Sequence, residues 1–324
     1  MRVETSDANA RIRALRPAKP PVDPWRAHGW SIEDERRPNG IVERVLTVFL
    51  AGAECPFTCS FCDLWRYTAD GPTPAGAIPR QLEDTLLEAK DVALDRIKLY
   101  NASNFFDRRA VPSVDLPRIA ELCTRFAGVT VESHARTVGP ATLEFARLLQ
   151  GRLEVSIGLE TIHPEASRHL NKHLGLGDFE RAASLLADNG IDLRAFVLLG
   201  APYVPPDASV EWAVRSAECA GTRGAAIVAI IPVRGGNGEV ERLAALGRFE
   251  PPTLRQLERA LDRCVGWTHT AVQADLWDVD RLPACAACRS ARVARLRRLN
   301  LRGVVESAVE CDACDEPVTA SVTP

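Results

Sequence analysis

The chain has 324 residues, and its 40 lysine and arginine side chains against 43 aspartate and glutamate side chains give a formal net charge of −3 at pH 7. This length suits one large α/β barrel with small additions, or two modest domains, and the charge excludes a general attraction to nucleic acid. The sequence has neither the run of about 18 apolar residues that a membrane helix needs nor the apolar core of a signal peptide. We therefore expect a cytoplasmic protein with no membrane partner.

The chain divides into three segments. Residues 1–43 are rich in proline and charge, and we expect them to wrap the surface of the core. Residues 44–270 form this expected core, and residues 271–324 form a C-terminal extension. Helical patterns alternate along the core with apolar strand-like runs, which are residues 45–50, 96–101, 129–134, 153–160, 193–200 and 225–232. Such continuous hydrophobicity is typical of parallel strands buried on both faces, so these βα units predict a partial, TIM-like (β/α)6 barrel of the α/β class.

Ten cysteines in a chain without a signal peptide indicate metal or cofactor chemistry rather than disulfides. Cys55, Cys59 and Cys62 follow the first strand-like run with the spacing Cys-x3-Cys-x2-Cys. Three thiolates cannot close a tetrahedral zinc site, whereas on a [4Fe–4S] cluster they leave one iron without a protein ligand. That open iron can bind the amino and carboxylate groups of a small molecule such as S-adenosylmethionine (SAM). The alternative is a group of structural or reactive cysteines.

This spacing, with Phe61 just before the third cysteine, resembles the signature of the radical SAM superfamily. The resemblance implies a partial barrel and an enzyme that cleaves SAM reductively to a 5′-deoxyadenosyl radical, which abstracts hydrogen from a substrate. It also implies an electron donor such as flavodoxin or ferredoxin. Together with the segments KLYNASNFFD and SIGLETIHPEASRHLNK, the motif is similar to the archaeosine-synthase radical SAM subunit and its bacterial relatives in the elongator-type branch, over about residues 40–315. This similarity implies a tRNA or a modified nucleoside as substrate.

The resemblance also implies a SAM site at the C-terminal ends of the strands. Asn101, Ala102 and Ser103 stand where the superfamily usually has Gly-Gly-Glu, whose carbonyls and acid hold the methionyl ammonium. This chain has no acid there, so the backbone and the Ser103 hydroxyl must serve. Glu132 matches an acidic residue that contacts the ribose hydroxyls, and its alternative is an ordinary ion pair at the mouth of the barrel.

Four further residues complete the expected site. Glu160 matches the Gln or Glu of the fourth strand, and Lys172 matches the Arg or Lys that binds the SAM carboxylate, although it could also be a solvated helix residue. Gly200 begins a Gly-Ala-Pro stretch whose backbone usually lies against the adenine. His134 is the candidate catalytic proton donor, and a local hydrogen bond is its alternative role.

A second group of cysteines lies in the extension, in two Cys-x2-Cys pairs: Cys285, Cys288, Cys311 and Cys314. Four thiolates with this spacing predict a closed structural zinc site, with a second [4Fe–4S] cluster or a single iron ion as alternatives. The segment between the pairs is basic, so Arg292, Arg295 and Arg298 are candidates for binding RNA phosphates. The alternative is a solvated helix whose Val293, Leu296 and Leu299 pack inward.

Three functions remain open from the sequence. The first is a radical SAM enzyme that modifies a tRNA or a nucleoside. The second is a radical SAM enzyme that acts on a small metabolite or a natural-product intermediate. The third is a zinc-containing nucleic-acid-binding protein on a catalytically silent barrel, and the intact cysteine triplet argues against it.

Overall fold

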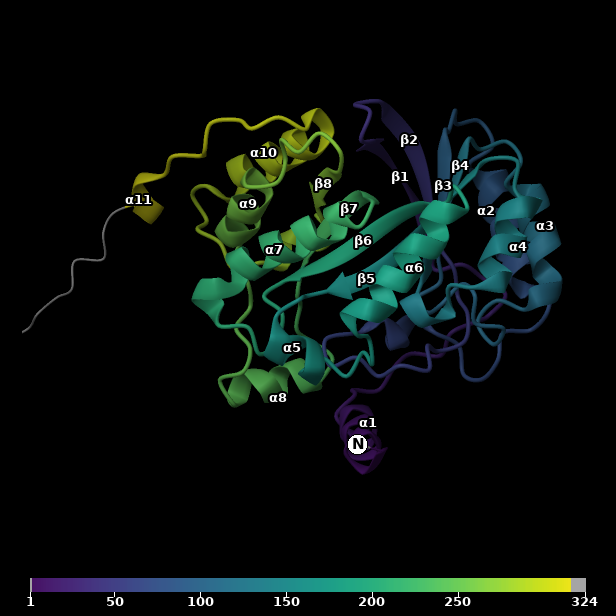
Figure 1. Ribbon diagram of the computed structural model, residues 1–324, viewed down its shortest axis with the longest axis horizontal. Coiled ribbons are helices and arrows are strands. Elements are labelled where there is room, and N and C mark those ends of the chain that lie inside the picture. Colours follow the sequence, from purple (N-terminus) through teal and green to yellow (C-terminus); the bar gives the residue numbers. More distant parts are fainter. Residues whose placement is uncertain (1, 316–324) are drawn as a thin grey trace, which may run out of the picture.

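The computed structural model describes residues 2–315. These residues form one eight-stranded sheet whose strands follow one another in chain order, from β1 (Gly29–Arg36) to β8 (Ala271–Ala274). β1 is antiparallel to β2 (Val42–Phe49), and every later pair of neighbours is parallel. The sheet curls into a partial barrel with helices along its outer side (Figure 1). No helix in the described part of the chain is long and apolar enough to cross a membrane.

The remaining strands are β3 (Arg96–Tyr100), β4 (Gly128–Ser133), β5 (Arg152–Glu160), β6 (Asp192–Leu199) and β7 (Ala225–Pro232). The helices between and after them are α2 (Ala77–Glu88), α3 (Leu116–Leu122), α4 (Pro140–Leu148), α5 (Pro164–His169), α6 (Leu176–Asp188), α7 (Ser209–Thr222), α8 (Glu239–Ala245) and α9 (Leu254–Asp262). Helices outside this alternation are α1 (Arg2–Ala14), α10 (Arg289–Arg302) and α11 (Asp312–Asp315).

The six strand-like runs are β2 to β7, so the prediction of a partial α/β barrel is confirmed. Every residue of β5 except the first is buried, as expected for a parallel strand covered on both faces. The covering helices pack apolar side chains against the sheet, and Phe145 of α4 and Phe179 of α6 are fully buried. This core fixes the ends of the strands, where a site can form.

Two strands were not predicted, and each comes from a terminal segment. β1 belongs to residues 1–43, where it pairs along its whole length with β2, and β8 belongs to residues 271–324. β1 ends in a run of charged residues, 33–36, and β8 has only four residues. Neither has the long apolar run by which the other strands were recognised. The last residues of the extension, 316–324, lie outside the described part of the chain.

Charged side chains fill the barrel interior toward the N-terminal ends of the strands. Glu35 of β1 pairs with Lys98 of β3 and with Arg194 of β6, so its contacts cross the interior. Glu154 of β5 accepts a hydrogen bond from Arg194 at 2.8 Å and forms an ion pair with Arg37 at 2.7 Å. Burial alone would raise the pKa of Glu35, but Arg194 and Lys98 lower it to about 2. The network therefore stays ionised and holds β1 against the parallel strands.

α10 joins the two edges of the sheet. The Asn300 side chain donates to the Ala274 carbonyl and accepts from the Ala274 N–H, both at 2.8 Å, as a neighbouring strand would. The Arg36 guanidinium of β1 donates to the Asn300 carbonyl at 3.4 Å, and the Gln273 amide of β8 donates to the Arg36 carbonyl at 2.8 Å. These contacts cover polar groups of both edge strands.

Candidate cluster and cofactor site

The loop of residues 55–62 follows β2 and is fixed by hydrogen bonds on both sides. The Gln81 side chain binds the Ala51 N–H and carbonyl, each at 2.8 Å, before the loop begins. The Ser60 N–H donates to the Leu170 carbonyl at 2.9 Å, and the Asn237 amide donates to the Ser60 carbonyl at 2.9 Å. The three cysteines are thus presented by a fixed loop at the C-terminal end of the barrel.

The thiols of Cys55, Cys59 and Cys62 lie in a largely buried environment and influence one another. Burial raises the pKa of Cys59 to about 12, and the neighbouring Cys55 adds to this shift, while the Lys172 ammonium opposes it. Burial likewise raises the pKa of Cys62. Thiolates in this environment need nearby positive charge, which iron would supply together with Lys172. The triplet therefore suits a metal cluster better than a set of free thiols.

His134 makes local hydrogen bonds with both ring nitrogens. Its Nδ1 accepts from the Arg136 N–H at 3.2 Å, so Nε2 carries the proton and donates to the Lys172 carbonyl at 3.0 Å. The ring stacks on Phe57, with centroids 3.9 Å apart and planes 12° from parallel. Burial, with a smaller effect of Lys172, lowers the pKa of His134 to about 4. This arrangement favours the local hydrogen-bonding role over that of a catalytic proton donor.

Glu132 binds the backbone of the loop that follows β3. Its carboxylate accepts from the Asn101 N–H at 2.8 Å and also from the backbone of Ala102 and Ser103. Burial raises the pKa of Glu132 to about 7, although these hydrogen bonds oppose the rise. Glu132 therefore shapes this loop, in which Ala102 has a left-handed φ of 54°.

The same loop presents polar atoms that have no partner. The Asn101 side chain is fully buried, and neither its amide oxygen nor its amide nitrogen makes a hydrogen bond within the described chain. The Ser103 hydroxyl is buried and equally without a partner. Buried polar groups are nearly always hydrogen-bonded, so such atoms at the mouth of a barrel indicate a polar ligand. The ammonium and carboxylate of SAM would fit them.

Glu160 and Lys172 form a buried ion pair at the end of β5. A register shift between Gly158 and Glu160, together with a positive φ of 65° at Glu160, aims this carboxylate at Lys172. A Cβ at Gly158 would overlap both charged groups, so a larger residue there would displace the pair. Burial would lower the pKa of Lys172, but Glu160, Cys59 and Cys55 together raise it, because its ammonium lies near the cluster loop.

Gly200 ends β6 with a φ of 72°, and an added Cβ would lie 2.7 Å from Pro252. Its N–H already donates to the Ser209 hydroxyl at 2.8 Å, so only its carbonyl and the following backbone are available to an adenine. The sequence indicated this position correctly as a strand end.

Aromatic side chains face the interior at the same end of the barrel. The Tyr100 and Phe196 rings meet across the interior with centroids 6.4 Å apart, and Phe49 meets Trp277, which follows β8, at 5.1 Å. Phe49, Tyr100 and Phe196 are only half-buried. Beside them, Arg234, which follows β7, pairs with Asp275, which follows β8. We call these four aromatic residues and this pair the mouth group: Phe49, Tyr100, Phe196, Trp277, Arg234 and Asp275. Asp275 and Trp277 were missed because β8 was not predicted.

Asn104 lies in the KLYNASNFFD segment, at a strand end, but the sequence alone assigned it no role. Its amide nitrogen donates to Cys55 Sγ at 3.2 Å, and its amide oxygen accepts from the His134 N–H at 2.5 Å. Asn104 thus joins the cluster loop to the end of β4. Its position three residues after Asn101 was the only signal available.

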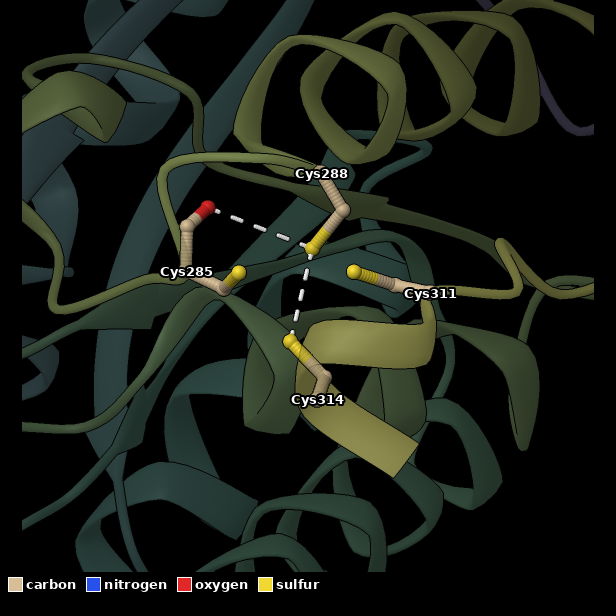
Figure 2. Close-up of side chains that lie close together, drawn as sticks. All are labelled: Cys285, Cys288, Cys311 and Cys314. Atoms are coloured by element: carbon tan, nitrogen blue, oxygen red, sulfur yellow. Dashed lines mark hydrogen bonds between the residues drawn. The ribbon is translucent and has the colours of Figure 1, made fainter. Parts of the chain in front are cut away.

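The four C-terminal cysteines converge on one point (Figure 2). Their sulfur atoms all lie within 4.8 Å of one another, and those of Cys288 and Cys314 are 3.7 Å apart. Cys288 immediately precedes α10, Cys311 immediately precedes α11, and Cys314 lies on α11. The predicted grouping of four potential metal ligands is therefore found.

Two arginines of the basic helix between these pairs face inward. Arg292 and Arg295 are 4% and 1% exposed, and both pair with Glu258 of α9. Arg292 also donates to Cys288 Sγ at 3.1 Å. This placement argues against the prediction that Arg292 and Arg295 bind RNA phosphates. Arg298 is exposed and pairs with Glu306 at 3.0 Å, and the predicted inward packing of Val293, Leu296 and Leu299 is found.

No protein-family profile matches this chain, and no curated protein sequence matches it. Among solved structures, Elp3 from the archaeon Methanocaldococcus infernus, with residues 1–46 deleted, matches with 13% identity and a TM-score of 0.51, over 70% of this chain and 59% of that one. This chain thus spans about three fifths of the length of that structure. A radical SAM methyltransferase from Sphaerobacter thermophilus matches with 17% identity and a TM-score of 0.49, over 82% and 80% of the two chains.

Coproporphyrinogen III oxidase (HemN) from Escherichia coli, described as a radical SAM enzyme, matches with 13% identity and a TM-score of 0.47, over 79% of this chain and 54% of that one. At identities this low the likeness shows the fold alone, and the activity has to be argued from the site itself. The expected partial barrel is confirmed by the sheet of this chain and by its likeness to Elp3, with a TM-score of 0.51.

Proposed function

We propose that this protein is a radical SAM enzyme that removes a hydrogen atom from its substrate. The observation that carries the proposal is the polar, unpartnered loop beside the cysteine triplet, with Asn101 and Ser103 on one side and Lys172 near the thiols. A ligand that binds an open iron through charged groups would satisfy these atoms. When bound together, a reduced [4Fe–4S] cluster and SAM supply one-electron chemistry that ends in removal of a hydrogen atom from carbon.

The side chains of the protein would then have distinct roles. Cys55, Cys59 and Cys62 would hold three irons, and Asn101 Oδ1 would accept from the methionyl ammonium. Lys172 would bind the carboxylate, with Glu160 holding the lysine in place. The roles suggested for the Glu132 carboxylate and the Gly200 backbone are loop positioning and contact with the adenine. Fixed partners of this kind orient the ligand without reorganisation.

For the substrate we favour a nucleoside, either free or within tRNA. The mouth group offers aromatic faces, on which a planar base can stack, and an arginine–aspartate pair that can bind the edge of a base. The exposed Arg298 is the remaining candidate for an RNA phosphate. A planar small metabolite would use the same aromatic faces without any phosphate contact, and it is the second candidate.

The test is anaerobic reconstitution with iron and sulfide, followed by SAM, dithionite and candidate substrates. We expect brown protein with absorbance near 400 nm that forms 5′-deoxyadenosine, and the variant with Cys55, Cys59 and Cys62 all replaced by alanine should lack both properties. Deoxyadenosine formation in that variant would refute the assignment. Binding of tRNA that weakens steeply with salt would distinguish an RNA substrate from a small metabolite. A protein that binds RNA and zinc but never cleaves SAM would be the silent barrel.

For the second cysteine group we propose a structural zinc ion. Four sulfurs at about 2.3 Å from one zinc lie about 3.8 Å from each other in a tetrahedron. The separation of 3.7 Å between Cys288 and Cys314, and the limit of 4.8 Å for all four, agree with one ion. A [4Fe–4S] cluster would need its four cysteines farther apart, because each binds a different iron.

Replacement of Cys285 and Cys288 by serine should remove one zinc per chain and make the segment from α10 to α11 sensitive to proteases. The physical reason is that metal binding supplies much of the folding energy of a small thiolate site. The absorbance of the barrel cluster should not change, which separates the two metal sites. Metal analysis of about eight irons and no zinc per chain would replace this proposal with a second cluster.

A further inference from the structure

A pocket of about 390 Å³ lies beside Cys55. Cys55 of the cluster loop and the preceding Glu54 form part of its wall, and Arg13, Arg16 and Arg109 form another part. Arg13 belongs to α1, Arg16 follows that helix, and Arg109 lies in the loop after β3. The side chains assigned to SAM do not line this pocket. The pocket therefore gives access to Cys55, a proposed cluster ligand, from a side other than that of the SAM site.

α1 is fixed in place over the cluster loop, at the rim of the molecule (Figure 1). Ile12 is 3% exposed, and the Asn9 amide oxygen accepts from the Asn171 amide at 2.8 Å. Arg11 pairs with Glu239 of α8 at 3.3 Å. The arginines of this helix are thus presented to solvent by a segment with several points of attachment.

The rim of the pocket carries free positive charge. Arg13 and Arg109 are exposed, and within residues 2–315 neither makes an ion pair. The acids of the wall are already occupied, because Glu54 pairs with Arg16 at 2.7 Å and Asp70 pairs with a lysine at 2.8 Å. An approaching partner with a negative surface would therefore be attracted to the two free arginines.

We infer that Arg13 and Arg109 dock an acidic one-electron carrier protein, of the flavodoxin or ferredoxin class, next to Cys55. The inference rests on the proposed function, because only a redox cluster at Cys55 needs such a carrier. In the exchange one electron would pass from the reduced carrier to an oxidised cluster held by Cys55, Cys59 and Cys62. The carrier is left one electron more oxidised, and no bond or proton is transferred at the pocket.

An RNA strand could also meet these arginines through its phosphates. Hydrogen removal, however, requires a substrate group inside the barrel, at the mouth group, whereas electron transfer requires only closeness to the cluster. The pocket lies beside Cys55, and none of the side chains assigned to SAM binding line it. This geometry favours the carrier over a substrate.

The experiment compares two reductants on the reconstituted full-length protein. Rates of 5′-deoxyadenosine formation are measured with dithionite and with flavodoxin that is kept reduced by NADPH and flavodoxin reductase. We expect the Arg13→Glu, Arg109→Glu double variant to need at least roughly tenfold more flavodoxin than wild type to reach half of its maximal rate. With dithionite, its rate should equal that of wild type. The matched control is Arg147→Glu, Arg297→Glu, since these arginines are exposed on α4 and α10 and the net charge changes equally. Its flavodoxin dependence should stay that of wild type.

Three outcomes would overturn the inference. An equal loss with both reductants in the Arg13, Arg109 variant would assign the pocket to the cofactor site. Unchanged flavodoxin dependence would remove the docking role, and it would assign the arginines to RNA if tRNA binding fell instead. A wild-type protein that forms no deoxyadenosine even with dithionite would overturn the proposed function as well, which makes the two failures distinguishable.

Discussion

Replacement of Asn101 by leucine is expected to stabilise the SAM-free protein and to weaken its binding of SAM. The Asn101 side chain is fully buried, and within the described chain both of its amide groups lack hydrogen-bond partners. A buried polar group without a partner costs about 1–3 kcal/mol, and leucine has nearly the same shape as asparagine. Allowing for partial hydration, we expect the free energy of unfolding to rise by about 1–2 kcal/mol.

Asn104 provides the matched control, because it is 2% exposed and uses both amide groups, on Cys55 and on the His134 N–H. Asn104→Leu leaves that N–H buried without a partner and should lower the free energy of unfolding by about 2–3 kcal/mol. Urea unfolding followed by circular dichroism measures both variants. Calorimetric titration of the cluster-loaded Asn101→Leu protein should show SAM binding weakened roughly tenfold or more. If Asn101→Leu is as destabilising as Asn104→Leu, or binds SAM like wild type, Asn101 is not reserved for a ligand.

Three further changes test other parts of the site. Burial raises the pKa of Glu132 from 4.5 to about 7, so between these pH values the folded state binds the proton and the unfolded state releases it. The free energy of unfolding should therefore fall with rising pH in this window, by up to about 3 kcal/mol, and Glu132→Gln should remove that slope in urea titrations. Lys172→Met leaves Glu160 buried and unpaired and should cost about 3–5 kcal/mol, most of which the double change with Glu160→Gln should restore. Gly200→Ala adds a clash to a φ of 72°, while Gly247→Ala meets no atom within 4 Å at a φ of 64°, so thermal unfolding should show the first to be costlier by about 1–3 kcal/mol.

The sequence predicted those parts of the fold that depend on local signals. Six strands were recognised because their runs are buried on both faces, and the cluster loop was recognised from the spacing of three cysteines. β1 was missed because Glu33 and Glu35 make it look like a charged surface segment. The partner that makes Glu35 an interior residue, Arg194, is distant in sequence, and no local pattern reveals such a pair.

The same limitation explains the arginines of α10. Arg292 and Arg295 resemble a phosphate-binding surface when only their own helix is considered. Their acids, Glu258 and Asp262, come from α9, and the pairing makes these two arginines face inward. Charge patterns on one helix indicate a solvated surface only when no neighbouring element carries the opposite charge.

The Asn101–Ser103 loop is supported by an acid from a neighbouring strand. Glu132 at the end of β4 binds the N–H groups of this loop, and the loop then leaves its polar side chains free. No pattern within the loop itself indicates this support, because Glu132 lies 31 residues after Asn101.

The C-terminal cysteine site is connected to the mouth group through α10. Cys288 immediately precedes this helix, and Arg292 joins the Cys288 sulfur to Glu258 of α9. Farther along α10, Asn300 replaces a strand partner for Ala274, which immediately precedes Asp275 of the mouth group. A metal ion that fixes the start of α10 would thus also fix the end of β8 and the Arg234–Asp275 pair. The cluster loop follows β2 and is supported by Gln81 and Asn237 instead, so the C-terminal metal would act on the substrate side of the barrel and not on the cluster.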